Sequence, residues 1–155
     1  MKTYIIKSEK DLEKFKDDYG YYIDGNAKFE YSADFTGRLK VDGYLEVKAG
    51  WSIKAGGYIE AGGYIKAGGS YGISAGLQIT CKDELKFGLK CFAGICTWRK
   101  ISDEEKTITC GKFSGGVVEY GILKETGNSK KSELLSKADE LIKKAEELKA
   151  EAENL

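Results

Sequence analysis

The 155-residue sequence contains neither histidine nor proline. Histidine is the commonest general base and the commonest neutral metal ligand, so without it we expect no catalysis and no cofactor. The absence of proline suits a continuous hydrogen-bonded β-ladder, because each proline would remove one backbone N–H donor. Lysine plus arginine and aspartate plus glutamate number 25 each. The chain therefore lacks the basic excess that is typical of nucleic-acid binding.

Long apolar runs are also lacking. No stretch approaches the roughly 18 apolar residues that indicate a transmembrane helix. The first residues, Met1-Lys-Thr-Tyr-Ile-Ile-Lys, do not contain the longer apolar core of a secretory signal. These two absences predict a cytoplasmic protein that does not associate with membranes.

The sequence does contain a long alternation of apolar or small residues with polar ones, from Tyr21 to Cys81. Alternation with period two is typical of extended chain with one buried face. A period of six is superimposed on it, most clearly in the repeats Ile-Lys/Glu-Ala-Gly-Gly-Tyr/Ser. Apolar anchors follow this period at Phe29, Phe35, Val41, Val47, Ile53, Ile59 and Ile65. Because six is an even number, every anchor faces the same side of the chain.

These patterns predict a mostly β protein, a single-stranded β-solenoid (β-helix) built on six-residue repeats over residues 21–82. Three sides would make each turn three repeats long and stack Val47 on Ile65, whereas two sides would make it two repeats long. The glycine pairs that end the repeats, at residues 56–57, 62–63 and 68–69, are expected at corners whose backbone φ favours glycine. At Ile73 the anchor shifts by two residues, which keeps the same face inward.

Residues 1–20 are predicted to form a strand and an N-terminal capping helix. Ser8 is a candidate N-cap, and Leu12, Phe15 and Tyr19 form an apolar stripe for a helix over residues 9–19. Such a helix would cover the unpaired strand edges at the end of a solenoid. A helix that docks on a partner is the alternative interpretation.

Residues 83–123 are expected to close the far end of the solenoid as a β segment. Phe92 and Trp98 supply large side chains for this closure. Residues 107–113 and 117–123 read as two strands of a hairpin, because Ser-Gly-Gly separates them.

The last segment, residues 133–155, follows a polar linker at 124–132 and carries a heptad pattern. We interpret it as an amphipathic oligomerisation helix of coiled-coil type, because a lone helix with so narrow an apolar face is marginal in water. Packing on the chain's own body, a frayed free helix and an engineered tail are the alternatives. The seam alternates leucine with alanine: Leu134, Ala138, Leu141, Ala145, Leu148 and Ala152.

The four cysteines are Cys81, Cys91, Cys96 and Cys110. They contain no Cys-x-x-Cys pair, so they match the spacing of structural zinc sites poorly. Cys81 and Cys91 share the phase of the buried residues, where cysteine behaves as a small apolar side chain. We therefore expect no metal site.

The outward positions of the repeats combine tyrosine with lysine. Tyrosine is stiff and amphipathic, and it is enriched at protein interfaces. The candidate interface consists of Tyr44, Tyr58, Tyr64, Lys54 and Lys66. Ordinary solvated side chains on the solenoid surface are the alternative, since single exposed aromatic residues are common.

The Ile-Lys-Ala-Gly-Gly run and the cysteine-containing segment after it, within residues 40–123, resemble a group of uncharacterised repeat proteins from bacteria and their phages. The repeats are more distantly similar to bactofilin-like polymer-forming solenoids and to hexapeptide-repeat acyltransferases. The catalytic histidine of the acyltransferases has no counterpart here. The resemblance implies a β-solenoid and a mobile-element origin.

The function expected from these observations is non-catalytic binding of a protein partner by a solenoid. The phage-like repeats imply an inhibitor of a host defence system, similar to anti-CRISPR proteins, that occupies a partner's surface. Self-association, most simply a homodimer through the C-terminal helix, is expected as well. A self-assembling filament is the first alternative and an acyltransferase-like enzyme the second.

Overall fold

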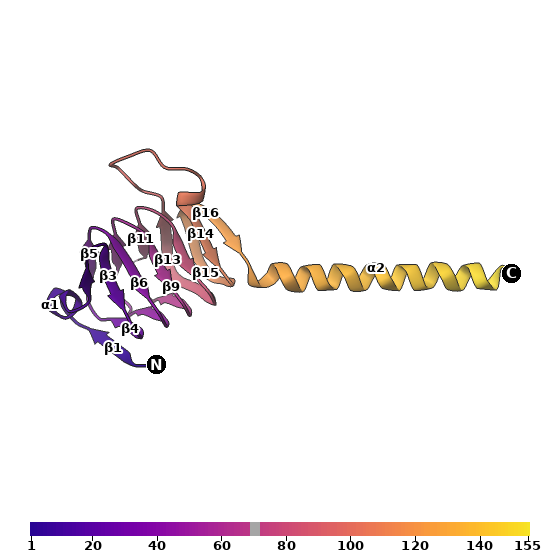
Figure 1. The fold of residues 1–155 in the computed structure, drawn as a ribbon, viewed down its shortest axis with the longest axis horizontal. Coiled ribbons are helices and arrows are strands. Elements are labelled where there is room, and N and C mark those ends of the chain that lie inside the picture. The colour runs from indigo at the N-terminus through magenta and orange to yellow at the C-terminus, as the bar shows by residue number, and fades with distance from the viewer. Residues whose placement is uncertain (69–71) are drawn as a thin grey trace.

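The structure, a computed structural model, describes residues 1–68 and 72–155, with the side chains of all of these except Leu89 and residues 128–133. It is mostly β: a β-solenoid of about four turns is followed by one long C-terminal helix (Figure 1). The short helix α1 (Glu9–Glu13) lies at one end of the solenoid. The long helix α2 (Gly127–Glu153) leaves the other end and extends away from it. The predicted fold class is confirmed at this level.

The strands lie in three stacks, which we name I, II and III, and strands of successive turns pair in parallel. Stack I contains β1 (Thr3–Ile6), β4 (Asn26–Phe29), β7 (Leu45–Val47) and β10 (Ile65–Ala67). Stack II contains β5 (Ala33–Phe35), β8 (Ile53–Ala55) and β11 (Ile73–Ala75). Stack III contains β2 (Lys16–Asp17), β3 (Gly20–Ile23), β6 (Arg38–Val41), β9 (Ile59–Ala61), β12 (Ile79–Cys81), β14 (Thr107–Cys110) and β16 (Ile122–Glu125).

Two longer strands complete the solenoid. The strand β13 (Glu84–Ala93) pairs first with β10 and then with β11, so it joins stacks I and II in one nine-stranded sheet. The strand β15 (Lys112–Tyr120) pairs in parallel with β13, and a 3-10 turn at Glu104–Lys106 precedes β14. The predicted hairpin is therefore wrong. Gly116 lies inside β15 with a φ of 96°, a left-handed value that suits glycine, and the chain there continues the solenoid instead of reversing.

The strand register gives the length of a turn. Leu45 pairs with Ile65, and Ile53 pairs with Ile73, so a central turn is twenty residues long. The earlier turn from Ala27 to its partner Leu45 keeps the predicted length of three six-residue repeats. A uniform six-residue repeat is not confirmed, and Val47 stacks on Ala67 instead of Ile65. The side between stacks I and II has two extra residues, and because two is even the inward face is preserved.

The core is a column of inward side chains from the three stacks. The isoleucines of the repeats are completely buried, and each is followed two residues later by a buried small residue. Ile73 lies inward, as the predicted shift of the anchor requires. The residues at the centre of this column are Leu39, Leu45, Ile53, Ile59, Ile65, Ile73, Ile79 and Leu85.

Two of the corner glycines, Gly57 and Gly62, are needed for a reason that the sequence did not predict. Among the described residues, positive φ values occur at other glycines and not at Gly57 or Gly62. A Cβ atom at Gly57 would lie 2.8 Å from the carbonyl carbon of Gly37, and one at Gly62 would overlap the carbonyl oxygen of Asp42. The close approach of the previous turn therefore excludes a side chain. Part of the third pair, Gly69, lies outside the described residues.

The N-terminal segment is less helical than expected. Ser8 accepts a hydrogen bond from the Asp11 N–H at 3.3 Å, as predicted for an N-cap, but α1 ends at Glu13. The chain then forms β2, which pairs antiparallel with β3. Leu12 is buried, whereas Tyr19 is 73% exposed. The helix predicted over residues 9–19 is wrong in length, because its last apolar position has no core to face.

The boundary between the last strand and the C-terminal helix also differs from the prediction. Lys124 and Glu125 belong to β16, and α2 begins at Gly127. Only Thr126 separates the two elements, and its N–H donates to the Cys110 carbonyl at 2.8 Å. The predicted linker at 124–132 is therefore strand and helix.

Replacement of Ile59 by Asp should destabilise the solenoid by about 4 kcal/mol or more, because an unpaired charge would enter the column. Ile59 is fully buried, and the neighbouring Glu60 points outward on the same strand. The matched variant Glu60→Ala should change the free energy of unfolding by less than about 0.5 kcal/mol. Urea unfolding measures both. Equal losses would contradict the inward phase of β9.

The free energy of unfolding should fall at high pH, and ionisation of Tyr21 should account for part of that fall. Burial, with a hydrogen bond from its hydroxyl to Glu13 at 2.9 Å, raises the pKa of Tyr21 to about 12. The unfolded chain releases this proton near its ordinary pKa of 10.0. The stabilisation is therefore complete below pH 10 and declines as the pH rises from there toward 12. Urea unfolding should show a shallower decline for Tyr21→Phe than for the unchanged chain, and parallel declines would refute this assignment.

Candidate functional site

Two of the predicted interface tyrosines stack on each other at one corner of the solenoid. Tyr44 directly precedes β7 and Tyr64 directly precedes β10, so they occupy equivalent positions in successive turns. Their ring centroids are 4.8 Å apart and their planes differ by 2°. Both side chains are half-buried. The corner therefore presents a rigid pair of aromatic rings.

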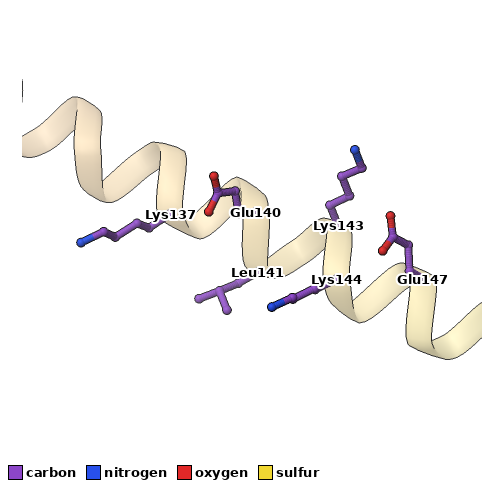
Figure 2. Close-up of a pocket in the computed structure, with 6 residues that line it drawn as sticks. All are labelled: Lys137, Glu140, Leu141, Lys143, Lys144 and Glu147. Carbon is purple, nitrogen blue, oxygen red and sulfur yellow. The ribbon is translucent and has the colours of Figure 1, made fainter.

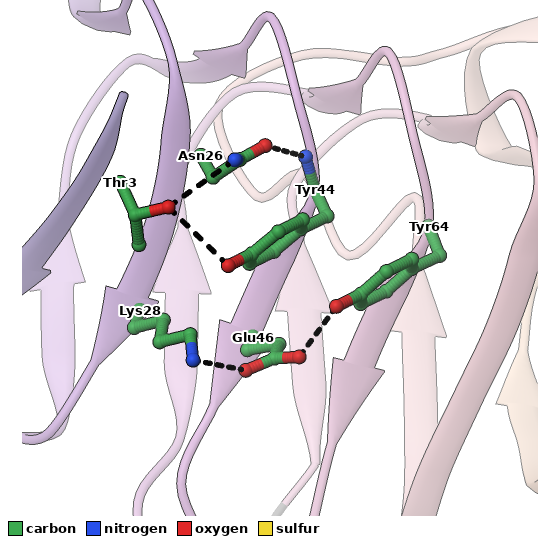
Figure 3. Close-up of polar contacts among 6 residues, drawn as sticks. All are labelled: Thr3, Asn26, Lys28, Tyr44, Glu46 and Tyr64. Atoms are coloured by element: carbon green, nitrogen blue, oxygen red, sulfur yellow. Dashed lines mark hydrogen bonds and ion pairs between the residues drawn. The ribbon is translucent and has the colours of Figure 1, made fainter. Parts of the chain in front are cut away.

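Polar contacts hold this pair in place (Figure 3). The Tyr64 hydroxyl donates to Glu46 Oε1 at 2.6 Å, and Lys28 Nζ lies 3.6 Å from Glu46 Oε2. Burial, together with the hydrogen bond to Glu46, raises the pKa of the Tyr64 phenol. The Tyr44 N–H donates to Asn26 Oδ1 at 3.0 Å. The Tyr44 hydroxyl lies 3.4 Å from Thr3 Oγ1, so contacts with neighbouring turns set the orientation of both rings.

Lysine side chains flank the two rings. Lys66 Nζ lies 4.6 Å from the ring centroid of Tyr64, and Lys28 Nζ lies 5.9 Å from that of Tyr44, within the range of a cation–π contact. A hollow of about 350 Å³ adjoins them. The outward residues of stack I continue this row in register, and we name the whole set the tyrosine–lysine band: Lys28, Tyr44, Glu46, Tyr64, Lys66 and Lys86.

The other two predicted interface residues do not belong to this band. Tyr58 precedes a stack III strand, where its hydroxyl accepts a hydrogen bond from Arg38 Nη1 at 3.2 Å. Lys54 lies on β8 in stack II, in register with Asp34 and Ser74. Residues one repeat apart lie on different sides of a three-sided solenoid. The five candidate interface residues therefore lie on more than one side of the solenoid.

Trp98 was predicted from the sequence to help close the far end of the solenoid, but it lies exposed at the surface. Trp98 is 64% exposed, so it does not close the end of the solenoid as predicted. It lies at the rim of a hollow of about 580 Å³ that Lys54 and Phe35 also line. The polar surroundings of Trp98 in the sequence, Thr97 and Arg99, were the available signal of exposure.

Three of the four cysteines provide no reactive group. Cys81, Cys91 and Cys110 are buried, and none of the four cysteines forms a disulfide. Burial raises the pKa of the Cys81 and Cys91 thiols to about 12 and that of Cys110 to about 11, so all three are protonated at neutral pH. Among the side chains that the structure describes, no cluster of three or more cysteine, aspartate or glutamate residues is arranged to hold a metal ion.

The second candidate surface is α2. Every residue from Leu134 to Leu155 is exposed, so this described part of the helix does not pack on the chain's own body. The exposed fractions of Leu134, Leu141 and Leu148 are 59%, 67% and 64%. Figure 2 shows the middle of the helix, where the side chains of α2 alone bound the hollow around Leu141. The predicted oligomerisation residues thus form one uncovered seam: Leu134, Ala138, Leu141, Ala145, Leu148 and Ala152.

Comparison with family models, with curated proteins and with solved structures finds no match to this chain. Among the helices that the structure describes, none combines the length and apolar character needed to cross a bilayer. The functional interpretation of the two candidate surfaces therefore depends on their geometry alone.

Removal of the Tyr64 hydroxyl should destabilise the chain by about 1 kcal/mol, because Glu46 loses a short hydrogen bond at a half-buried site. The matched variant is Tyr19→Phe. The Tyr19 side chain is 73% exposed, so this substitution should lower the free energy of unfolding by less than about 0.5 kcal/mol. Urea midpoints of Tyr64→Phe and Tyr19→Phe provide the comparison. Indistinguishable midpoints would show that the band is not held by this contact.

Proposed function

We propose that this chain is a non-catalytic binding protein that works as a self-associated pair of solenoids. The observation that carries the proposal is the uncovered leucine–alanine seam of α2. Three leucines on one helix face are each more than half exposed, although burial of a leucine side chain stabilises by about 2 kcal/mol. The seam of a second copy of the chain provides an apolar surface against which these leucines are buried.

The body of the solenoid supplies the binding surface. The tyrosine–lysine band combines rigid aromatic rings with positive side chains, and aromatic residues are enriched at protein interfaces. Three lysines and one glutamate make the band net positive, which favours an acidic protein surface. The resemblance to phage repeat proteins supports a component of a host defence system as the partner, inhibited by occupation of its surface.

The architecture serves this role in two further ways. Each Ile-Lys/Glu-Ala-Gly-Gly unit forms one side of a solenoid turn. Its isoleucine and alanine face inward, and its charged residue faces outward. The α1 turn acts as the N-terminal cap, and the burial of Leu12 against the core supports this role. A capped and regularly stacked body holds the band in one conformation, which lowers the entropic cost of binding.

A self-assembling filament is a second candidate, favoured by the ends of the solenoid. Among the described pairings, β1 and β16 each have one neighbour, and Ile5 and Ile122 are 53% and 39% exposed on them. Open strand edges of this kind can pair with another copy. Electron microscopy at micromolar protein distinguishes the candidates: discrete particles support the binding protein, and fibres support the filament.

Substitution in the seam tests self-association. The full chain should sediment as a dimer, and Leu141→Gln combined with Leu148→Gln should sediment as a monomer because the seam loses its large apolar side chains. The matched variant Ala150→Gln, on the outer face of α2, should remain dimeric. A monomeric unchanged chain at high micromolar concentration would contradict the proposal.

Capture from a bacterial lysate tests the binding surface. The unchanged chain should retain a partner that Tyr64→Ala with Lys66→Glu loses and that Lys40→Glu, on stack III, still retains. Loss with all variants or with none would exclude the band as the binding surface. A chain ending at Gly127 should retain the same partner more weakly, because it engages only one site at a time.

A further inference from the structure

We propose that two copies of α2 pair in antiparallel orientation, with each leucine of one seam packed against an alanine of the other. The inference rests on the self-association proposed above and adds the direction of the helices and the distance between the two solenoids. It depends on three observations: the alternation in the seam, the residue at which α2 ends, and the charges that flank the seam.

The alternation of leucine and alanine favours antiparallel packing. In a parallel pair, each residue of the seam meets its own copy, so Leu141 would meet the partner's Leu141 and Ala145 would meet the partner's Ala145. Alanine layers draw helix axes toward about 8 Å and leucine layers toward about 10 Å, and a straight pair of helices cannot satisfy both. In an antiparallel pair every layer contains one leucine and one alanine. The distance between the axes is then uniform along the seam.

The end of the helix selects the register. The helix α2 ends at Glu153, and Leu155 lies beyond it, fully exposed. Among the registers that use helical residues alone, the one that pairs the most seam residues places Leu134 opposite the partner's Ala152. It then also places Leu141 opposite the partner's Ala145, and Leu148 opposite the partner's Ala138. All six seam residues are paired in this arrangement.

The positions beside the seam favour this orientation on balance. At the centre of the pair, Ile142, which is 58% exposed, meets the partner's Ile142 on one flank and widens the apolar contact. On the other flank Lys144 meets its own copy, which is repulsive, but Lys137 faces the partner's Glu151 toward each end, with opposite charges. Parallel pairing would instead place Lys144 beside the partner's Lys149 on both flanks. The parallel orientation thus has two repulsive pairs, whereas the antiparallel orientation has one repulsive pair and two attractive pairs. This difference favours the antiparallel orientation.

Antiparallel pairing places the two solenoids at opposite ends of the helix pair. In the selected register the two Gly127 residues are separated by roughly 48 Å along the axis, at a rise of about 1.5 Å per residue. Each body leaves its own end of the pair with its band accessible. Each solenoid extends away from its own α2 (Figure 1). The dimer therefore fits a partner that repeats its binding site at a spacing of more than roughly 48 Å, such as an oligomer or a polymer.

A distance between spin labels on α2 tests the orientation. Glu153→Cys provides the label site on the exposed helix, in a chain with Cys96→Ser because the other three cysteines are buried. Antiparallel pairing in the selected register separates the two labels by roughly 30 Å along the axis. Parallel pairing places them side by side, within roughly 20 Å. A dimer with the long distance supports the inference, a dimer with the short distance overturns the orientation alone, and a monomer overturns the proposed self-association as well.

A charge exchange tests the register by a second route. Lys137→Glu should weaken the dimer about tenfold, because two attractive pairs with Glu151 become repulsive. Addition of Glu151→Lys should restore the dissociation constant to within about twofold of the unchanged chain. The matched variant Lys143→Glu, on the outer face of α2, should leave it unchanged. Failure of the second substitution to restore the dimer would overturn the pairing of these two positions.

Discussion

Hydrogen bonds between successive turns of the backbone are the interaction on which the rest of the structure depends. The Leu45 N–H donates to the Tyr64 carbonyl at 2.9 Å, and the Leu39 N–H donates to the Tyr58 carbonyl at 2.9 Å. Each such bond joins a strand to the one above it and fixes the length of the turn between them. This register places one inward isoleucine on another and closes the column to water. It also brings the backbone of adjacent turns so close that Gly62 cannot carry a side chain.

The same register creates the outer surface. Because equivalent positions of adjacent turns lie side by side, Tyr44 stacks on Tyr64 and Glu46 lies between Lys28 and Lys66. The binding surface that we propose is thus a by-product of the repeat, held by the same ladder as the core. The helix α2 has no such support from the body. Its exposed seam and its position at the end of the solenoid suit it to join copies of the chain (Figure 1).

Features set by local chemistry were predictable from the sequence, and features set by contacts between turns were not. The alternation of side chains identifies the inward residues, such as Ile59, because side-chain direction along a strand has period two. The heptad likewise identifies the seam of α2. The length of a turn depends on how long the corner before Ile53 is, and an extra pair of residues there leaves the alternation unchanged. For the same reason the sequence did not show that Tyr58 and Tyr44 lie on different sides, since the side that a residue occupies follows from the length of the turn.

The fold and the tyrosine–lysine band both depend on the register that pairs Leu45 with Ile65, and scalar coupling across backbone hydrogen bonds tests this register most directly. Nuclear magnetic resonance of the full chain, labelled with ¹⁵N and ¹³C, detects which carbonyl carbon is coupled to a given amide nitrogen. The register predicts coupling of the Leu45 amide to the Tyr64 carbonyl and of the Ile59 amide to the Gln78 carbonyl. Coupling of Leu45 to Gly62, as a turn of three six-residue repeats would produce, would contradict the register and with it the tyrosine–lysine band.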